Sequence, residues 1–207
     1  MRGHVFQNIL KVFLIPFMAI FICQQEGQAS SIAIPKEGQM LVEAEAPEAG
    51  KWPLHVRIIL PVEAEPAVVW KVLTDYEHMT EFVPHMKKCR VIERQGDILT
   101  VEEVFKHLLV SMELLLSVKE SPPNRIDFRL VGGNMKVYDG RWSIEPHNPA
   151  GTLLTLEVAV QPGFYAPRSL VSWILKKLLP EGVLSIREKA VEDSGKTLPP
   201  GEVEVIP

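Results

Sequence analysis

Apolar and polar side chains alternate along most of the middle of the chain, with the period of two that predicts β-strands. Residues 110–118 are the clearest example, because every second side chain from Val110 to Val118 is apolar, whereas Ser111 and Glu113 lie between them. The same pattern, interrupted by turn residues, predicts strands at 54–60, 88–93, 98–105, 110–118, 126–130, 138–144 and 154–160. Strands in such close succession predict an antiparallel sheet of about six or seven strands with one apolar face.

Helical spacing of apolar side chains is found at two places in the chain. Two short helices are expected after the first strand, over 66–73 and 77–83, because Pro66 suits a first helical position and Pro84 ends the second helix. A long helix is predicted over 167–192, with a break or kink at Pro180. Its apolar stripe is expected to cover the apolar face of the sheet, and Arg187 is expected to face water.

A cavity is expected between the sheet and the long helix, because a curved sheet that grips one helix cannot close tightly everywhere. The gap should fall where the two short helices approach the long one. The side chains predicted to line it are Phe82, Val83, Met112, Phe128, Trp142, Leu170, Trp173 and Ile174. The alternative is that the apolar stripe of the helix belongs to a filled core.

The first 29 residues have the organisation of a secretory signal peptide. Arg2 and Lys11 precede the apolar run 12–23, which is shorter than the roughly 20 residues that span a bilayer. Small residues at 27 and 29 place the expected cleavage after Ala29. We therefore expect export, to the periplasm or outside the cell. The alternatives are an uncleaved N-terminal membrane anchor and lipidation at Cys23.

Composition and charge narrow the class of partner. The chain has 207 residues, of which 46% are apolar and 23% charged, as in ordinary globular proteins. A net charge of −4 without a basic run argues against nucleic acid as a partner and gives no electrostatic attraction to anionic lipid. The folded domain is expected over 52–193, after a linker or weak edge strand at 30–51 and before a flexible tail at 194–207.

Candidate chemistry is sparse. The sequence lacks the spacing of a metal site, a phosphate-binding loop or a nucleophile elbow, so neither a metal nor a cofactor is expected. Cys89 is expected to be a small core residue rather than a nucleophile. Carboxylates in the predicted strands should face water, because burying an unpaired charge is costly, and they are Glu102, Glu103, Glu113, Asp139 and Glu157. One that faced the cavity would have a raised pKa and could act as a general acid or base.

Several segments carry a family pattern: EPAVVWKVLTDY at 65–76, FVP at 82–84, SPPNRI at 121–126, GRWSIEP at 140–146 and GTLLT at 151–155. They resemble the START-like superfamily, also called SRPBCC or Bet v 1-like, and within it the polyketide cyclase/dehydrase and coenzyme Q-binding branch. The resemblance implies an α+β helix-grip fold, in which a curved antiparallel sheet wraps around a long C-terminal helix. It implies an apolar cavity and no fixed set of catalytic residues. Ribosome-associated and mitochondrial quinone-linked members are also similar, but a secretory signal would put their partners out of reach.

Three functions remain open. The first is an exported carrier or sensor for a hydrophobic small molecule or lipid, with transient membrane contact. The second is a cyclase- or dehydratase-like enzyme that uses a cavity carboxylate, although the sequence lacks a paired acid and base. The third is a structural envelope protein with a filled core. We expect binding rather than turnover.

Overall fold

The computed structural model describes residues 34–36, 39–44, 51–108, 110–147 and 150–196, and the backbone of 202–206. All of them belong to the unit of the chain that runs from Ile34 to Pro207. The expected signal peptide over 1–29 lies outside the described residues. No helix in the described ranges is both long and apolar enough to cross a membrane.

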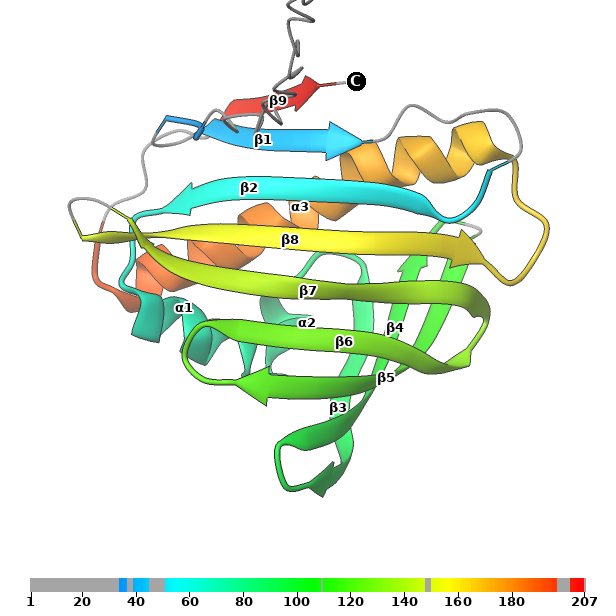
Figure 1. Ribbon diagram of the computed structural model, residues 1–207, viewed down its shortest axis with the longest axis horizontal. Coiled ribbons are helices and arrows are strands. Elements are labelled where there is room, and N and C mark those ends of the chain that lie inside the picture. The colour runs from blue at the N-terminus through cyan, green and yellow to red at the C-terminus, as the bar shows by residue number, and fades with distance from the viewer. Residues whose placement is uncertain are drawn as a thin grey trace, which may run out of the picture. The chain divides into compact units, whose positions relative to one another are not determined.

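Nine strands of the described segments form one sheet, in the order β3-β4-β5-β6-β7-β8-β2-β1-β9 (Figure 1). The strands are β1 (Gln39–Ala44), β2 (Leu54–Val62), β3 (Met86–Gln95), β4 (Ile98–His107), β5 (Val110–Ser121), β6 (Arg125–Gly133), β7 (Met135–His147), β8 (Gly151–Pro162) and β9 (Glu202–Ile206). Neighbouring strands are antiparallel, except that β1 and β9 run parallel.

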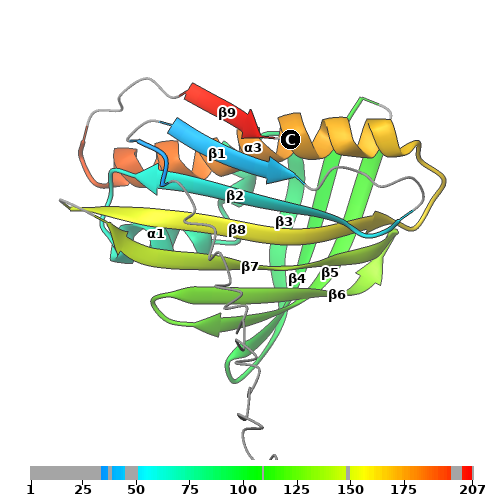
Figure 2. The same ribbon diagram turned by 45° about the horizontal axis from the view of Figure 1, so that its top comes forward.

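Three helices lie on one face of the sheet within the described part of the chain: α1 (Pro66–Leu73), α2 (Met79–Phe82) and α3 (Arg168–Asp193). Figure 2 shows that the sheet curves around α3, with β3, β4 and β5 turned across the helix at the far side. This arrangement confirms the predicted helix-grip fold. The apolar face of the sheet is covered on this side, as an amphipathic sheet requires.

The register of the central strands follows the alternation in the sequence. Trp142 on β7 pairs with Leu156 on β8, and both side chains belong to the core on the helix side of the sheet. Arg141 is exposed and forms an ion pair with Glu157 on the opposite face, 2.8 Å from Nε to Oε2. A slip of one residue would reverse these positions, so the pattern of buried and exposed residues determines the register.

Each end of the domain adds a strand: the N-terminal segment follows the strand alternative of the prediction, whereas the C-terminal segment differs from the predicted tail. The segment expected to be a linker or weak edge strand contains β1, which pairs with β2. The tail predicted to be flexible contains β9, which pairs with the outer side of β1. The free edge of β1 offers unpaired N–H and C=O groups, and β9 satisfies them. The sheet therefore has nine strands instead of six or seven.

Helix α3 does not break at Pro180, and it differs from the prediction at Arg187. It runs from Arg168 to Asp193 without interruption, and Pro180 lies buried inside it. Arg187 was expected to face water, but only 2% of its side chain is exposed. Its Nε and Nη2 each donate a hydrogen bond of 2.8 Å to the carboxylate of Glu63, at the end of β2. A bidentate pair of this kind allows a guanidinium to lie in the core face of a helix.

Candidate ligand-binding cavity

An apolar cavity of about 450 Å³ lies between the curved sheet and α3. Its walls come from strands β3 to β8, from the first half and middle of α3, and from the segment that contains α1 and α2. The volume falls in the range of roughly 300–1,000 Å³ that is typical of small-molecule sites. The structure therefore contains space that the helix does not fill.

Seven of the eight side chains predicted to line a cavity do line it: Val83, Met112, Phe128, Trp142, Leu170, Trp173 and Ile174. Phe82 is the exception, because its half-buried ring packs against the core cluster instead. Leu170 and Trp173 remain 39% and 45% exposed, so they lie at the edge of the cavity and not in its interior. Whether these residues contact a ligand stays a prediction.

An aromatic pair forms the sheet side of the cavity. The rings of Phe128 on β6 and Tyr138 on β7 lie 5.6 Å apart, and both line the cavity. Gly140 makes room for them, because a Cβ at this position would lie 2.7 Å from Cζ of Phe128 and 2.2 Å from the carbonyl oxygen of Glu157. Gly140 therefore admits the Phe128 ring and the backbone of β8.

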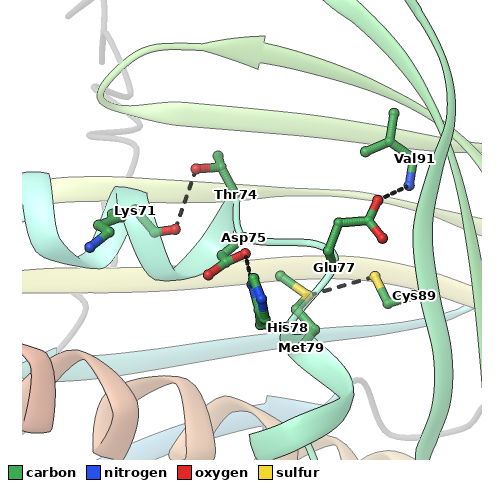
Figure 3. Close-up of polar contacts among 8 residues, drawn as sticks. All are labelled: Lys71, Thr74, Asp75, Glu77, His78, Met79, Cys89 and Val91. Atoms are coloured by element: carbon green, nitrogen blue, oxygen red, sulfur yellow. Dashed lines mark hydrogen bonds and ion pairs between the residues drawn. The ribbon is translucent and has the colours of Figure 1, made fainter.

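Two contacts, one from the joint between α1 and α2 and one from α2 itself, reach β3 (Figure 3). The backbone N–H of Val91 donates to Glu77 Oε1 at 3.2 Å, and the Cys89 thiol lies 3.9 Å from the sulfur of Met79. The Asp75 carboxylate lies 2.6 Å from His78 Nδ1, and α2 has no side-chain cap. These contacts position Met79, which lines the cavity.

Glu103 on β4 contradicts the expectation that the strand carboxylates face water. It pairs with Cys89 on β3 and Leu114 on β5, lies on the apolar face of the sheet and lines the cavity. The side chain is half-buried, and its exposed part faces the cavity. Desolvation raises the pKa of Glu103 to about 7. A carboxyl with this pKa changes charge near neutral pH.

The other strand carboxylates have partners or exposure away from the cavity. Glu102 accepts from Lys88 Nζ at 2.9 Å and from Arg90 Nε at 2.8 Å, and these hydrogen bonds lower its pKa. Asp139 accepts the backbone N–H of Leu130, and Glu113 is exposed. For these carboxylates and for Glu157, the expected orientation is confirmed.

The remaining polar groups near the cavity include two tyrosines and a cysteine. Tyr76 donates its hydroxyl to Glu120 Oε1 at 3.0 Å, and burial together with this carboxylate raises its pKa. Burial also raises the pKa of Tyr138, with a smaller contribution from Glu103. Cys89 is buried, and burial raises the pKa of its thiol, which suits the expected core role.

Two histidines meet at the edge of the cavity, although they are far apart in the sequence. His85 and His107 stack edge to face, with ring centroids 4.4 Å apart and Nδ1 atoms 3.3 Å apart. The ring of Trp173 lies 6.3 Å from that of His107. Leu108, 91% exposed at the tip of the β4–β5 hairpin, completes this edge. Among the described residues, no group of three or more His, Cys, Asp or Glu could hold a metal ion.

Replacing Trp173 with alanine is expected to weaken binding of apolar probes about tenfold, since losing roughly 50 Å² of ligand contact costs about 1.3 kcal/mol. The empty protein should lose about 1 kcal/mol or less, because the ring is 45% exposed. Titration with a hydrophobic dye and chemical denaturation measure the two effects. Tyr165→Ala is the control, because Tyr165 is 96% exposed and does not line the cavity. A loss of about 3–5 kcal/mol, with no dye bound by the parent, would indicate a filled core.

Comparison with known families matches residues 62–187 to the family described as polyketide cyclase/dehydrase and lipid transport. The match covers more than half of the chain and includes the cavity walls from α1 to α3. A search of curated proteins found no match.

Solved structures share the fold at low sequence identity. Human STARD10 superposes with a TM-score of 0.63 and 14% identity, over 78% of this chain and 72% of that chain. The Zhui aromatase/cyclase from a Streptomyces species gives a TM-score of 0.61 and 16% identity, over 69% and 98%. A STAR-related lipid transfer protein from Xanthomonas axonopodis gives 0.60 and 15%, over 75% and 95%. At this identity the likeness establishes the fold alone.

Proposed function

This chain belongs to the polyketide cyclase/dehydrase and lipid transport family, and from that premise we propose that it is a carrier of a hydrophobic small molecule or lipid. The observation that carries the proposal is the cavity of about 450 Å³ between sheet and α3, with an almost entirely apolar lining. Each 100 Å² of apolar ligand surface buried there contributes about 2.5 kcal/mol to binding. Apolar burial can therefore supply most of the affinity.

The exposed side chains around the edge of the cavity suit a carrier. Leu108, Phe164 and Trp173 are 91%, 43% and 45% exposed and line the edge of the cavity, and large apolar groups gathered on a surface mark contact sites. The edge of the cavity gives the carrier a surface for transient contact with a membrane, where an apolar ligand is collected or delivered. The STAR-related lipid transfer protein with the same fold supports this part of the proposal.

A cyclase-like enzyme is the second candidate, favoured by Glu103. A carboxyl with a pKa of about 7 in an apolar cavity has the property that general acid–base catalysis requires. The aromatase/cyclase with the same fold supports this alternative. The enzyme is less well supported because, in the described part of the chain, no second acid or base forms a hydrogen bond with Glu103. The neighbouring Tyr76 and the two histidines bond to other groups. We therefore place the carrier first.

We also propose that the carrier acts outside the cytoplasm. The support is the sequence alone: the charged start, the short apolar run 12–23 and the small residues before Ser30. An exported protein would be separated from cytoplasmic enzymes that act on the same class of ligand. Export therefore favours a carrier over an enzyme that catalyses one step of a cytoplasmic reaction sequence.

Purification from the native host tests both parts. Solvent extraction is expected to release an apolar compound in stoichiometric amount, which mass spectrometry identifies. The intact mass of the protein is expected to match a chain that begins at Ser30. An extract without an apolar compound, from protein that binds no hydrophobic probe, would contradict the proposed carrier function. A mass that includes residues 1–29, or a diacylglyceryl adduct at Cys23, would contradict export with signal-peptide cleavage. Conversion of the extracted compound by the protein, abolished by Glu103→Gln, would establish the enzyme.

A further inference from the structure

Two polar groups on the largely apolar wall of the cavity have no protein hydrogen bond, unlike the other polar side chains that line it. They are the carboxyl of Glu103 on β4 and the hydroxyl of Tyr138 on β7, and both line the cavity. Among the described residues, no side-chain hydrogen bond or ion pair is formed by either group. By contrast, the nearby Tyr76 hydroxyl is held by Glu120 at 3.0 Å. A polar group enclosed by apolar side chains is costly unless something hydrogen-bonds to it.

The position of Glu103 separates it from the edge of the cavity. His107 lies four residues further along β4, which corresponds to about 13 Å at 3.3 Å per residue. The side chains around Glu103 come from the α1–α2 joint, β3 and β7, because Tyr76, Cys89 and Tyr138 each interact electrostatically with it. Glu103 therefore lies in the interior, where a ligand that enters past His107 and Trp173 would place its leading end.

The charge of the wall has one sign. Among the described residues that line the cavity, none is Lys or Arg, and the two histidines lie at the edge. A carboxylate or phosphate placed in the interior would meet Glu103 with no cation to balance either charge. A hydroxyl or ammonium group would instead donate to the Glu103 carboxyl and satisfy it.

We propose that Glu103 is the anchor for a ligand that carries a hydrogen-bond donor, a hydroxyl or an amine, at the leading end of an apolar skeleton. This inference rests on the proposed function and specifies its ligand class. Tyr138, whose hydroxyl both donates and accepts, is the second group within reach of the same polar end. Fatty acids and lipids that would insert a phosphate are disfavoured, and long-chain alcohols, sterol-like alcohols and amines are favoured.

Calorimetric titration of the ligand-stripped full chain with decylamine, decanol and decanoate tests the anchor. At pH about 8, above the pKa of about 7, Glu103 is mostly ionised. The parent is then expected to bind decylamine tightest and decanoate weakest. Glu103→Gln should lower the affinity for decylamine about tenfold and raise the affinity for decanoate, because it removes the charge but keeps a hydrogen-bonding oxygen. Glu103→Leu should also weaken decanol, by about fivefold, since it removes the acceptor.

The matched control is Glu113→Gln on the neighbouring strand β5, where the carboxyl is exposed and does not line the cavity. It should leave all three affinities as in the parent. If the parent binds the three probes and both Glu103 variants bind them with the same affinities, Glu103 is not the anchor, but the proposed carrier function is retained. If the parent binds none of the probes, both the carrier function and the role of Glu103 are wrong.

Discussion

Replacing Arg187 with methionine is expected to lower the free energy of unfolding by about 3 kcal/mol. Methionine refills much of the volume, but the substitution removes two charge-assisted hydrogen bonds of 2.8 Å and leaves the Glu63 carboxylate without the guanidinium. Glu63 remains 15% exposed, so water relieves part of the penalty and the loss should fall at the low end of the range for broken buried pairs. Denaturant unfolding of the parent and the variant measures the difference.

Two further variants separate the buried charge from other effects of the substitution. Lys189→Met on the same helix removes a lysine that pairs with Glu192 and Asp193 at the surface, and it should change stability little. Combining Arg187→Met with Glu63→Leu should recover a substantial part of the loss, because apolar residues of similar volume replace the whole pair. If Arg187→Met behaved like Lys189→Met, the ion pair would not stabilise the fold.

Replacing Glu103 with glutamine is expected to make the empty protein more stable at pH 8 than the parent, by up to about 3 kcal/mol. The pKa of Glu103 rises from its ordinary value of 4.5 to about 7 on folding, so the folded state holds the proton more tightly than the unfolded state. Below pH 4.5 the carboxyl is neutral in both states and costs nothing through its charge. Between about pH 4.5 and 7 the unfolded state ionises while the folded state keeps its proton, so stability falls over this interval and levels off above pH 7, where both states are charged.

The measurement for Glu103 is the difference in unfolding free energy between parent and variant, followed from about pH 4.5 to 8. Groups that titrate in both proteins cancel in this difference, which should grow over the interval. Glu113→Gln, an exchange of the same kind at an exposed position of β5, gives the baseline. A difference that does not change with pH would mean that Glu103 is solvated like a surface carboxyl.

The central strands, α1 and the cavity could be predicted because their signals are local and repeated. Alternation along β5 and β8 sets which side chains face α3, and Pro66 marks the start of α1. Seven of the eight predicted lining side chains followed from the apolar face of the sheet and the stripe of the long helix. The prediction for Phe82 was wrong because α2 is only four residues long, and helical spacing over so short a helix does not indicate which side faces inward.

Glu103 and Arg187 were missed although the sequence carried a signal for each. Glu103 stands between Val101 and Phe105 in the alternation of β4, so parity placed it on the apolar face. Arg187 lies four residues after Val183 and three before Ala190, both buried, so helical spacing placed it inward. The cost of burying charge argued for water in both cases. Glu63 offsets that cost for Arg187, and a raised pKa reduces it for Glu103.

The contact of His85 with His107 and the pairing of β9 with β1 had no local signal. The two histidines are separated by a full strand and a turn, and they meet only because β3 and β4 pair with their ends aligned. The β9 segment is only five residues long, and its strand character depends on the open edge of β1. Both features depend on tertiary context and therefore require the folded chain.

For the proposed carrier, we expect the edge of the cavity to affect how long a ligand stays bound. It consists of the β4–β5 hairpin tip, the segment between β8 and α3, and the first turns of α3, where Leu108 and Trp173 are exposed. Exposed segments with few core contacts open at a small fraction of the cost of global unfolding. For the proposed carrier, we therefore expect a ligand to enter and leave past these exposed side chains while the sheet stays intact. Residence time would then depend on the edge and affinity on the wall, so the rate of exchange could vary among related proteins without a change in what they bind.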